Sequence, residues 1–311
     1  MTGAPSPPAQ RAAGAKEPPV WMDMDQAQLD AAYNQSVYAP NMQQVLQRLA
    51  TNSEVTRRHI GAPQRFSYGS TPTEALDLYR TTRPNAPVNV FIHGGGWRSG
   101  QAQDYGYAAE LFVHAGAHFA VLDFINVLEA GGSLFPMVEQ VRRAVAWVYR
   151  NASGFGGDPN RIYLTGHSSG GHLAGVVLTT DWRGEFGLPA DLVKGGLCAS
   201  GMYDLAPVRL SARSTYVNFT DEMEQALSSQ RHLDKLNAPL IVACGSLETP
   251  EFQRQPRDFV AAIKAAGKPV ELLVGEHYNH FEIAETLAQP YGVLGRAVLK
   301  QMKLVPHKAP V

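Results

Sequence analysis

The chain has 311 residues, of which 44% are hydrophobic and 18% are charged, and its formal net charge is −1. This composition is typical of a water-soluble protein with a large core, and a nearly neutral chain without a dense Lys/Arg cluster is not expected to bind nucleic acid. The sequence contains no apolar run of the roughly 18–20 residues that a membrane-spanning helix needs, so we expect no membrane partner. The length allows one large α/β domain or two small ones.

Residues 1–20 are rich in Ala, Pro and Gly and lack the apolar segment of a signal peptide. We therefore predict a disordered tail and a cytoplasmic protein. The two cysteines, Cys198 and Cys244, lie inside apolar runs. They are predicted to be buried thiols, and so sparse a use of cysteine suits a reducing compartment.

The N-terminal part is predicted to contain one helix over residues 24–34, with Asp25 as its N-cap, and a second helix over residues 41–50. An antiparallel pair of strands is predicted to follow, at residues 65–68 and 75–79. Beyond residue 88, short apolar runs that indicate strands alternate with segments of helical length. The predicted strands are 88–92, 119–122, 162–164, 195–199, 240–244 and 270–274; the predicted helices are 105–115, 136–150, 168–180, 251–266 and 281–302.

This alternation predicts a doubly wound, mostly parallel sheet of about eight strands, covered by helices on both faces. Because no linker divides the sequence, residues 21–311 are expected to form a single α/β domain. The helices within 24–50 and the irregular insert 203–231 are candidates for small lid elements over the functional site.

The segment Gly166-His-Ser-Ser-Gly170 follows a predicted strand and precedes a predicted helix. Gly-x-Ser-x-Gly in that context forms a sharp turn that presents the central serine, here Ser168, as a nucleophile at the end of a sheet. The start of the following helix directs free N–H groups and the positive end of its dipole toward a developing anion. Ser168 needs a base, an acid and oxyanion donors, which should lie at other strand ends.

The strand at 88–92 leads into His93-Gly-Gly-Gly-Trp97. Consecutive glycines leave backbone N–H groups accessible, and we predict an oxyanion hole made by the N–H groups of Gly95, Gly96 and Ser169. His93 is expected to brace this loop rather than to take part in catalysis.

An acid and a base are predicted after the last two strands. Glu248 follows the strand at 240–244 and is the favoured acid, with Glu251, which begins the next helix, as the alternative. His280 follows the last strand and is the favoured base, with His277 as the alternative. The chain order serine, acid, histidine is that of the serine hydrolases with this strand–turn–helix motif.

A metal site is disfavoured by the spacing of the available ligands. His277 and His280 lie in a loop and lack the helical spacing of a zinc motif, and no acidic or histidine cluster completes a set with them. His172, one helical turn after Ser168, is expected to be a buried structural histidine. We therefore expect no metal and no cofactor.

With these motifs in hand, the chain resembles the α/β-hydrolase superfamily, and within it the kynurenine formamidase (arylformamidase)-like branch of the lipase/esterase group. The resemblance spans roughly residues 29–299 and is carried by four segments: His93–Trp97, Gly166–Leu173, Glu248–Gln255 and Asn279–Glu282. It implies Ser168 as nucleophile, Glu248 as acid and His280 as base. Two departures are a Glu where similar formamidases carry Asp, and Ser169 and Gly171 where they usually carry Ala.

The predicted function is that of a serine hydrolase, an arylformamidase-like amidase or a carboxylesterase. It would cleave a short formyl- or acetyl-type amide or ester of a small aromatic compound through an acyl-enzyme. One alternative is a general short-chain carboxylesterase; one from another class is a non-catalytic hydrolase-fold protein that binds a small ligand. The candidate pocket residues are Trp97, Tyr105, Phe124 and Tyr203, with Tyr33 as a further aromatic candidate. A homodimer is compatible with the pattern but is not specified by it.

Overall fold

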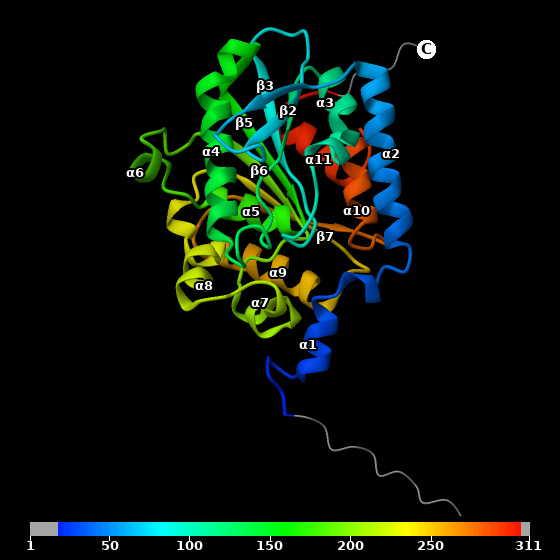
Figure 1. The fold of residues 1–311 in the computed structure, drawn as a ribbon, viewed down its shortest axis with the longest axis vertical. Coiled ribbons are helices and arrows are strands. Elements are labelled where there is room, and N and C mark those ends of the chain that lie inside the picture. Colours follow the sequence, from blue (N-terminus) through cyan, green and yellow to red (C-terminus); the bar gives the residue numbers. More distant parts are fainter. Residues whose placement is uncertain (1–17, 306–311) are drawn as a thin grey trace, which may run out of the picture.

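The computed structural model describes residues 18–305, in which eight strands form one sheet in the order β1-β2-β4-β3-β5-β6-β7-β8 (Figure 1). Residues 1–17 of the predicted tail lie outside the described part. The strands are β1 (Gln64–Ser67), β2 (Ala75–Tyr79), β3 (Ala86–Ile92), β4 (His118–Leu122), β5 (Gly157–His167), β6 (Val193–Ala199), β7 (Leu240–Gly245) and β8 (Val270–Gly275). β1 and β2 pair antiparallel at one edge, and β4 through β8 run parallel to β3. The predicted doubly wound sheet is confirmed.

Helices cover both faces of this sheet. Figure 1 shows α4 (Phe135–Asn151) and α5 (Ser169–Leu178) on the left and α2 (Met42–Ile60) and α3 (Ala109–Ala115) on the right. α9 (Pro250–Ala265) shares its hydrophobic core with α4 and α5, and α11 (Val293–Gln301) shares its core with α2 and α3. The remaining helices are α1 (Gln26–Ala32), α6 (Trp182–Phe186), α7 (Ala206–Leu210), α8 (Asp221–Leu227) and α10 (Glu282–Glu285).

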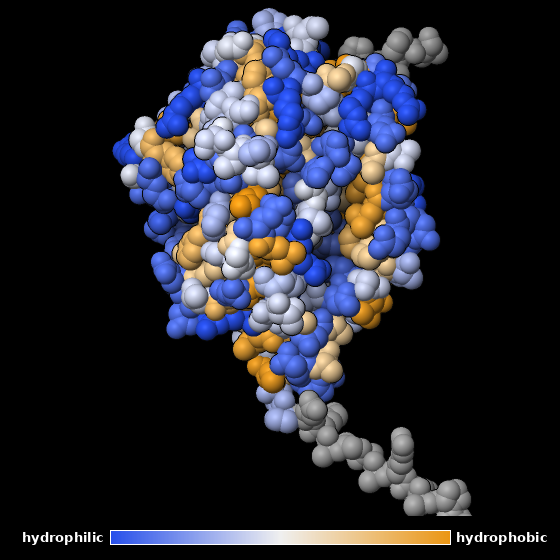
Figure 2. Space-filling view, viewed as in Figure 1, coloured by the Kyte–Doolittle hydropathy of each residue, from blue (hydrophilic) through white to orange (hydrophobic). Residues whose placement is uncertain are grey.

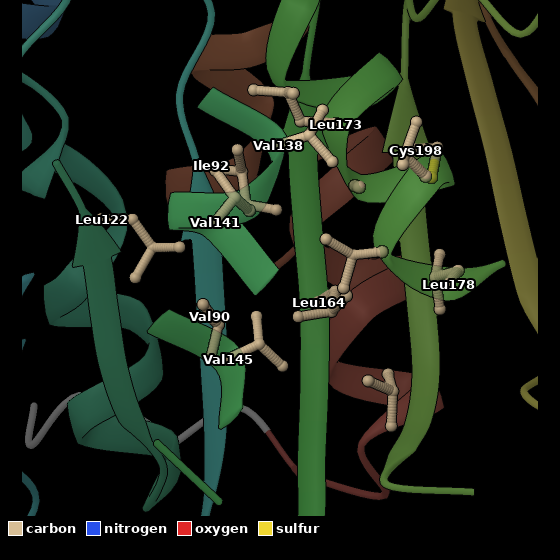
Figure 3. Close-up of a cluster of buried hydrophobic side chains, with 14 of the residues drawn as sticks. Val90, Ile92, Leu122, Val138, Val141, Val145, Leu164, Leu173, Leu178 and Cys198 are labelled. Carbon is tan, nitrogen blue, oxygen red and sulfur yellow. The ribbon is translucent and has the colours of Figure 1, made fainter. Parts of the chain in front are cut away.

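The two cores follow from the alternation of side chains along each strand. In β3, Val88, Val90 and Ile92 belong to one core, whereas Phe91 belongs to the other. Figure 3 shows Val138, Val141 and Val145 of α4 packed over Val90 and Ile92, with Leu164 of β5 alongside. Burying each of these side chains contributes about 1.5–3 kcal/mol, so the central strands form a rigid base for the loops at their carboxyl ends.

Several predicted boundaries shift. The second N-terminal helix extends to Ile60, ten residues past its predicted end. The helix predicted at 105–115 begins only at Ala109, because the 3₁₀ turn Gly106–Ala108 occupies its first residues. The helix predicted at 281–302 was wrong as one element: α10 and a 3₁₀ turn are separated from α11 by Pro290-Tyr-Gly292. Proline lacks the N–H that a continuous helix requires.

The surface mixes hydrophilic and apolar residues (Figure 2), and apolar residues gather at the lower end of the view, where Figure 1 places α1 and α7. Cys198 and Cys244 are buried free thiols, as predicted. None of the helices between residues 18 and 305 combines the length and the apolar character needed to cross a bilayer.

Candidate active site

Ser168 lies at the turn between β5 and α5 with backbone angles φ 58° and ψ −126°. This conformation is strained for a residue with a side chain, and it projects the hydroxyl away from the sheet. The turn needs a glycine behind it: a Cβ on Gly170 would lie 2.0 Å from the carbonyl oxygen of Ile92. Local sequence and close backbone packing therefore fix the position of Ser168.

His280 and Glu248 reach Ser168 from two other strand ends. The Ser168 hydroxyl donates to Nε2 of His280 across 2.8 Å, and Nδ1–H of His280 donates to Oε2 of Glu248 across 2.7 Å. All three residues are buried: 8% of the surface of Ser168 is exposed, 2% of that of His280 and 1% of that of Glu248. This arrangement sets the histidine tautomer so that Nε2 is free to accept the serine proton.

The two alternatives named from sequence lie elsewhere. Glu251 points away from His280. Each of its two carboxylate oxygens accepts a hydrogen bond from the Arg254 guanidinium at 2.7 Å, and Oε2 also accepts one from the Tyr33 hydroxyl. His277 is exposed. The geometry therefore joins Ser168 to His280 and Glu248 alone.

The second oxygen of Glu248 is also held in place. Oε1 accepts hydrogen bonds from the Gly245 N–H at 2.7 Å and from the Ser200 hydroxyl at 2.6 Å. Ser200 was not predicted as a site residue, although it directly follows β6 and the strand-end rule would have included it. These two donors fix the carboxylate and satisfy its buried lone pairs.

The glycine loop after β3 lies beside Ser168. Gly95 and Gly96 adopt φ values of 116° and 62°, and together with Ser168 and His280 they line a cavity of about 860 Å³. Between residues 18 and 305, the N–H groups of Gly95 and Gly96 and that of Ser169, which opens α5, have no hydrogen-bond acceptor. Free N–H groups of this kind are what an oxyanion hole requires.

Trp97 connects this loop to the nucleophile turn from behind. Its backbone N–H donates to the Ser169 hydroxyl at 3.2 Å, and its indole N–H donates to Nδ1 of His172 at 3.3 Å. Nε2–H of His172 donates in turn to the carbonyl of Leu227. Ser169, predicted only as a backbone donor, therefore also holds the glycine loop through its hydroxyl.

Of the four aromatic residues predicted for the pocket, only Tyr105 lines the cavity. Trp97 is buried behind the glycine loop, Phe124 stacks on His93 at 4.4 Å, and Tyr203 is buried against Phe259 at 4.2 Å. The prediction of these three as pocket residues was wrong, because their rings pack against other side chains and do not line the cavity. Tyr33, the further aromatic candidate, does line the cavity.

The outer walls of the cavity come from the two segments named as lid candidates. The N-terminal segment contributes residues between 30 and 49, and the insert contributes Ala212, Arg213, Thr215 and Tyr216. The N-terminal wall is attached close to the acid, because the Thr249 hydroxyl donates to the carbonyl of Ala32 at 2.6 Å. Sequence patterns identified these segments but not which of their side chains face the site.

Two buried histidines next to the site remain neutral. Burial, together with the nearby His280, lowers the pKa of His167 to about 3, and burial lowers the pKa of His172 to about 4. Nε2–H of His167 donates to the carbonyl of His280 at 2.8 Å and so holds the histidine loop. Among the described residues, no three His, Cys, Asp or Glu side chains converge as a metal site would require.

The kynurenine formamidase of Danio rerio is 30% identical to this chain, and the alignment covers 91% of this chain and 98% of that protein; the kynurenine formamidase of Salmo salar is 31% identical over the same shares. This chain belongs to the kynurenine formamidase-like α/β-hydrolases. The BD-FAE family matches residues 76–188 of this hydrolase and the prolyl oligopeptidase family matches residues 139–291.

Esterases share the fold of this α/β-hydrolase. A thermophilic esterase from Thermogutta terrifontis superposes with a TM-score of 0.64 at 20% identity, covering 81% of this chain and 98% of that one. Esterase B from Lactobacillus rhamnosis superposes with a TM-score of 0.67 at 15% identity, covering 86% and 95%. The isoprenylcysteine alpha-carbonyl methylesterase of Arabidopsis thaliana is 28% identical to this chain, and the alignment covers 70% of this chain and 56% of that protein.

Proposed function

We propose that this hydrolase cleaves a short formyl- or acetyl-type amide or ester of an aromatic compound through a serine acyl-enzyme. The observation that supports this most is the unbroken chain of hydrogen bonds from Ser168 to His280 to Glu248 beside the free N–H groups of Gly95 and Gly96. Nucleophile, base, acid and oxyanion donors thus meet at one end of a single cavity.

In the first step, the Ser168 oxygen attacks the substrate carbonyl while Nε2 of His280 takes the hydroxyl proton. The N–H groups of Gly95, Gly96 and Ser169 stabilise the oxyanion of the tetrahedral intermediate. His280 then protonates the leaving amine or alcohol, and the bond from the carbonyl carbon to that group breaks. Glu248 orients the imidazole and stabilises its charged form.

In the second step, His280 takes a proton from water, and the resulting hydroxide equivalent attacks the acyl-serine carbonyl. The ester bond to Ser168 breaks, the carboxylic acid leaves, and the serine recovers its proton from His280. The chemistry uses side chains and backbone groups of this chain alone.

The formamidase names of the two full-length relatives favour a formyl amide on an aromatic amine, and Tyr33 and Tyr105 supply aromatic surface in the cavity. A general short-chain carboxylesterase is the second candidate, supported by the esterase relatives and esterase-like solved structures. A panel of N-formylkynurenine, p-nitrophenyl acetate and p-nitrophenyl butyrate separates the two. A formamidase is expected to have its highest kcat/KM on the formyl amide.

Ser168→Ala tests the mechanism. We expect kcat to fall by roughly 10⁶ without loss of fold, because the nucleophile is removed while the packing around the turn stays. Labelling of Ser168 by a fluorophosphonate distinguishes an active hydrolase from a non-catalytic binding protein. Near-wild-type turnover of the variant would rule out the proposed mechanism.

A further inference from the structure

The cavity wall beside the glycine loop carries a net positive charge. Two arginines, Arg98 and Arg213, line the cavity together with one aspartate, Asp30. Oδ1 of Asp30 is already engaged, because it accepts from the Ala212 N–H at 2.6 Å and from the Gln26 amide at 2.9 Å. Two of the three charged side chains that line the cavity are therefore cationic.

Arg213 is held firmly but by neutral partners. Nη1 donates to the Tyr216 hydroxyl at 2.8 Å and Nη2 donates to the carbonyl of Tyr33 at 3.2 Å. The guanidinium lies over the rings of Trp97 and Phe252, with its central carbon 5.3 Å and 5.9 Å from the ring centroids. It is thus oriented in advance, without a carboxylate partner among residues 18–305.

The other arginines of the same insert differ in this respect. Arg209 pairs with Asp221 and Glu224, and Arg231 pairs with Asp204 and Glu224. A guanidinium has five N–H donors, and Arg213 uses two of them; its Nε–H is buried without a partner. A cation that is oriented, partly buried and left without a counter-charge suits an anionic ligand.

Arg213 also lies close to one of the proposed oxyanion donors. Its Nη1 is 3.6 Å from the point where a Cβ on Gly96 would be, and Gly96 offers one of the proposed oxyanion donors. Arg98 lies over the ring of Tyr216 at 4.3 Å, so a second positive charge stands at the same wall. A substrate bound at Ser168 would place groups next to its scissile bond within reach of Arg213.

We propose that Arg213 forms a carboxylate subsite and makes this hydrolase prefer substrates that carry a carboxylate near the scissile amide or ester bond. The planar guanidinium matches the two oxygens of a carboxylate, and the surrounding rings exclude water and strengthen the attraction. Arg213 is then a specificity-determining residue for substrate binding. The proposal rests on the proposed function, because it assumes that the substrate reaches Ser168.

Two matched pairs of esters test the subsite. The first compares 4-acetoxybenzoate with 4-acetoxybenzamide, in which an uncharged carboxamide of similar size replaces the carboxylate of the leaving group. The second compares phenyl hydrogen succinate with phenyl succinamate, in which a carboxamide replaces the carboxylate of the acyl group, with the spontaneous hydrolysis of each ester subtracted. In the wild type we expect the charged member of at least one pair to have about 10- to 100-fold higher kcat/KM, as for hydrogen bonds to a charged group.

Arg213→Gln should remove this preference, and Arg213→Lys should keep part of it because the charge remains. Arg209→Gln is the matched control, since Arg209 lies in the same insert but is paired with carboxylates away from the cavity. Absence of a charge preference in both pairs overturns the subsite. An equal loss on charged and neutral esters overturns it too, because Arg213 would then act on the oxyanion, which both esters form.

A binding measurement separates failure of the subsite from failure of the proposed function. If neither the four esters nor N-formylkynurenine is hydrolysed in a Ser168-dependent manner, the proposed function is wrong. Calorimetric titration with benzoate and with benzamide then measures the affinity of the subsite for each compound without turnover. Tighter binding of benzoate by the wild type, lost in Arg213→Gln, supports it, and equal binding of benzoate by both proteins overturns it.

Discussion

The backbone N–H of Trp97 donates a hydrogen bond to the hydroxyl of Ser169 across 3.2 Å. This contact joins the glycine loop after β3 to the first residue of α5, next to Ser168. The proposed oxyanion donors of Gly95, Gly96 and Ser169 come from these same two segments. Their relative position therefore depends on a side chain that the Gly-x-Ser-x-Gly motif leaves unspecified.

Ser169→Ala should lower kcat about fivefold while KM changes little, because one neutral hydrogen bond contributes about 1 kcal/mol and this one positions donors that act in the transition state. Steady-state kinetics on an ester substrate measures it. Ser133→Ala is the control, since among residues 18–305 the Ser133 hydroxyl accepts a hydrogen bond from the Phe135 N–H alone, in a separate loop. A rise in KM with unchanged kcat would contradict the positioning role.

Glu248→Gln should reduce kcat by roughly 10⁴, because the amide no longer stabilises the His280 imidazolium or its required tautomer. Glu251→Gln provides the matched comparison, three residues along the chain. We expect it to retain kcat within about tenfold and instead to lower the free energy of unfolding by about 1–3 kcal/mol, since Glu251 binds Arg254 and Tyr33. The assignment of the acid fails if the two variants lose activity equally.

Tyr33→Phe should destabilise the attachment of the N-terminal segment. The Tyr33 hydroxyl donates to Glu251 and accepts from the Gln255 amide, each across 2.7 Å, and burial, followed by Glu251, raises its pKa well above the usual value. Removing the hydroxyl leaves buried polar groups unpaired, so the free energy of unfolding measured with urea should fall by about 1–3 kcal/mol. The exposed Tyr38 makes Tyr38→Phe a suitable control, and an equal effect of both substitutions would exclude the specific role.

The stability of the protein should decrease as the pH falls below about 6.5. His167 and His172 have folded-state pKa values lowered to about 3 and about 4, mainly by burial, so between these values and 6.5 the unfolded chain binds more protons than the folded one. By linkage, each histidine then costs about 1.4 kcal/mol of unfolding free energy per pH unit within its window.

Urea unfolding at pH 7.5 and pH 5 measures this dependence. His172→Gln is expected to be less stable at pH 7.5, where it loses the bond to Trp97, but to lose less stability on acidification than the wild type. His277→Gln, at an exposed position, should behave as the wild type does at both pH values. An unchanged pH dependence in His172→Gln would show that this histidine is not responsible.

By itself, the sequence determined the sheet, the turn at Ser168 and the order of serine, acid and histidine. These features depend on neighbouring residues: apolar runs of strand length, the glycines around Ser168, and polar residues directly after strands. The break at Pro290-Tyr-Gly292 is local as well, and apolar periodicity across 281–302 obscured it. The observed helix boundaries differ from the predicted ones mainly at the start of α3, where 3₁₀ turns precede the helix, and at the end of α2, which extends past its predicted end.

Only the tertiary structure decided which of two nearby carboxylates meets His280, and which aromatic rings face the cavity rather than the core. Glu248 and Glu251 differ by three residues, but the turn from β7 into α9 directs Glu248 toward the loop after β8 and Glu251 toward Tyr33 of the N-terminal segment. Arg213 likewise lines the same cavity as Ser168 only because the insert folds next to the glycine loop. Side-chain direction is set by packing between segments far apart in the chain, and residue spacing does not encode it.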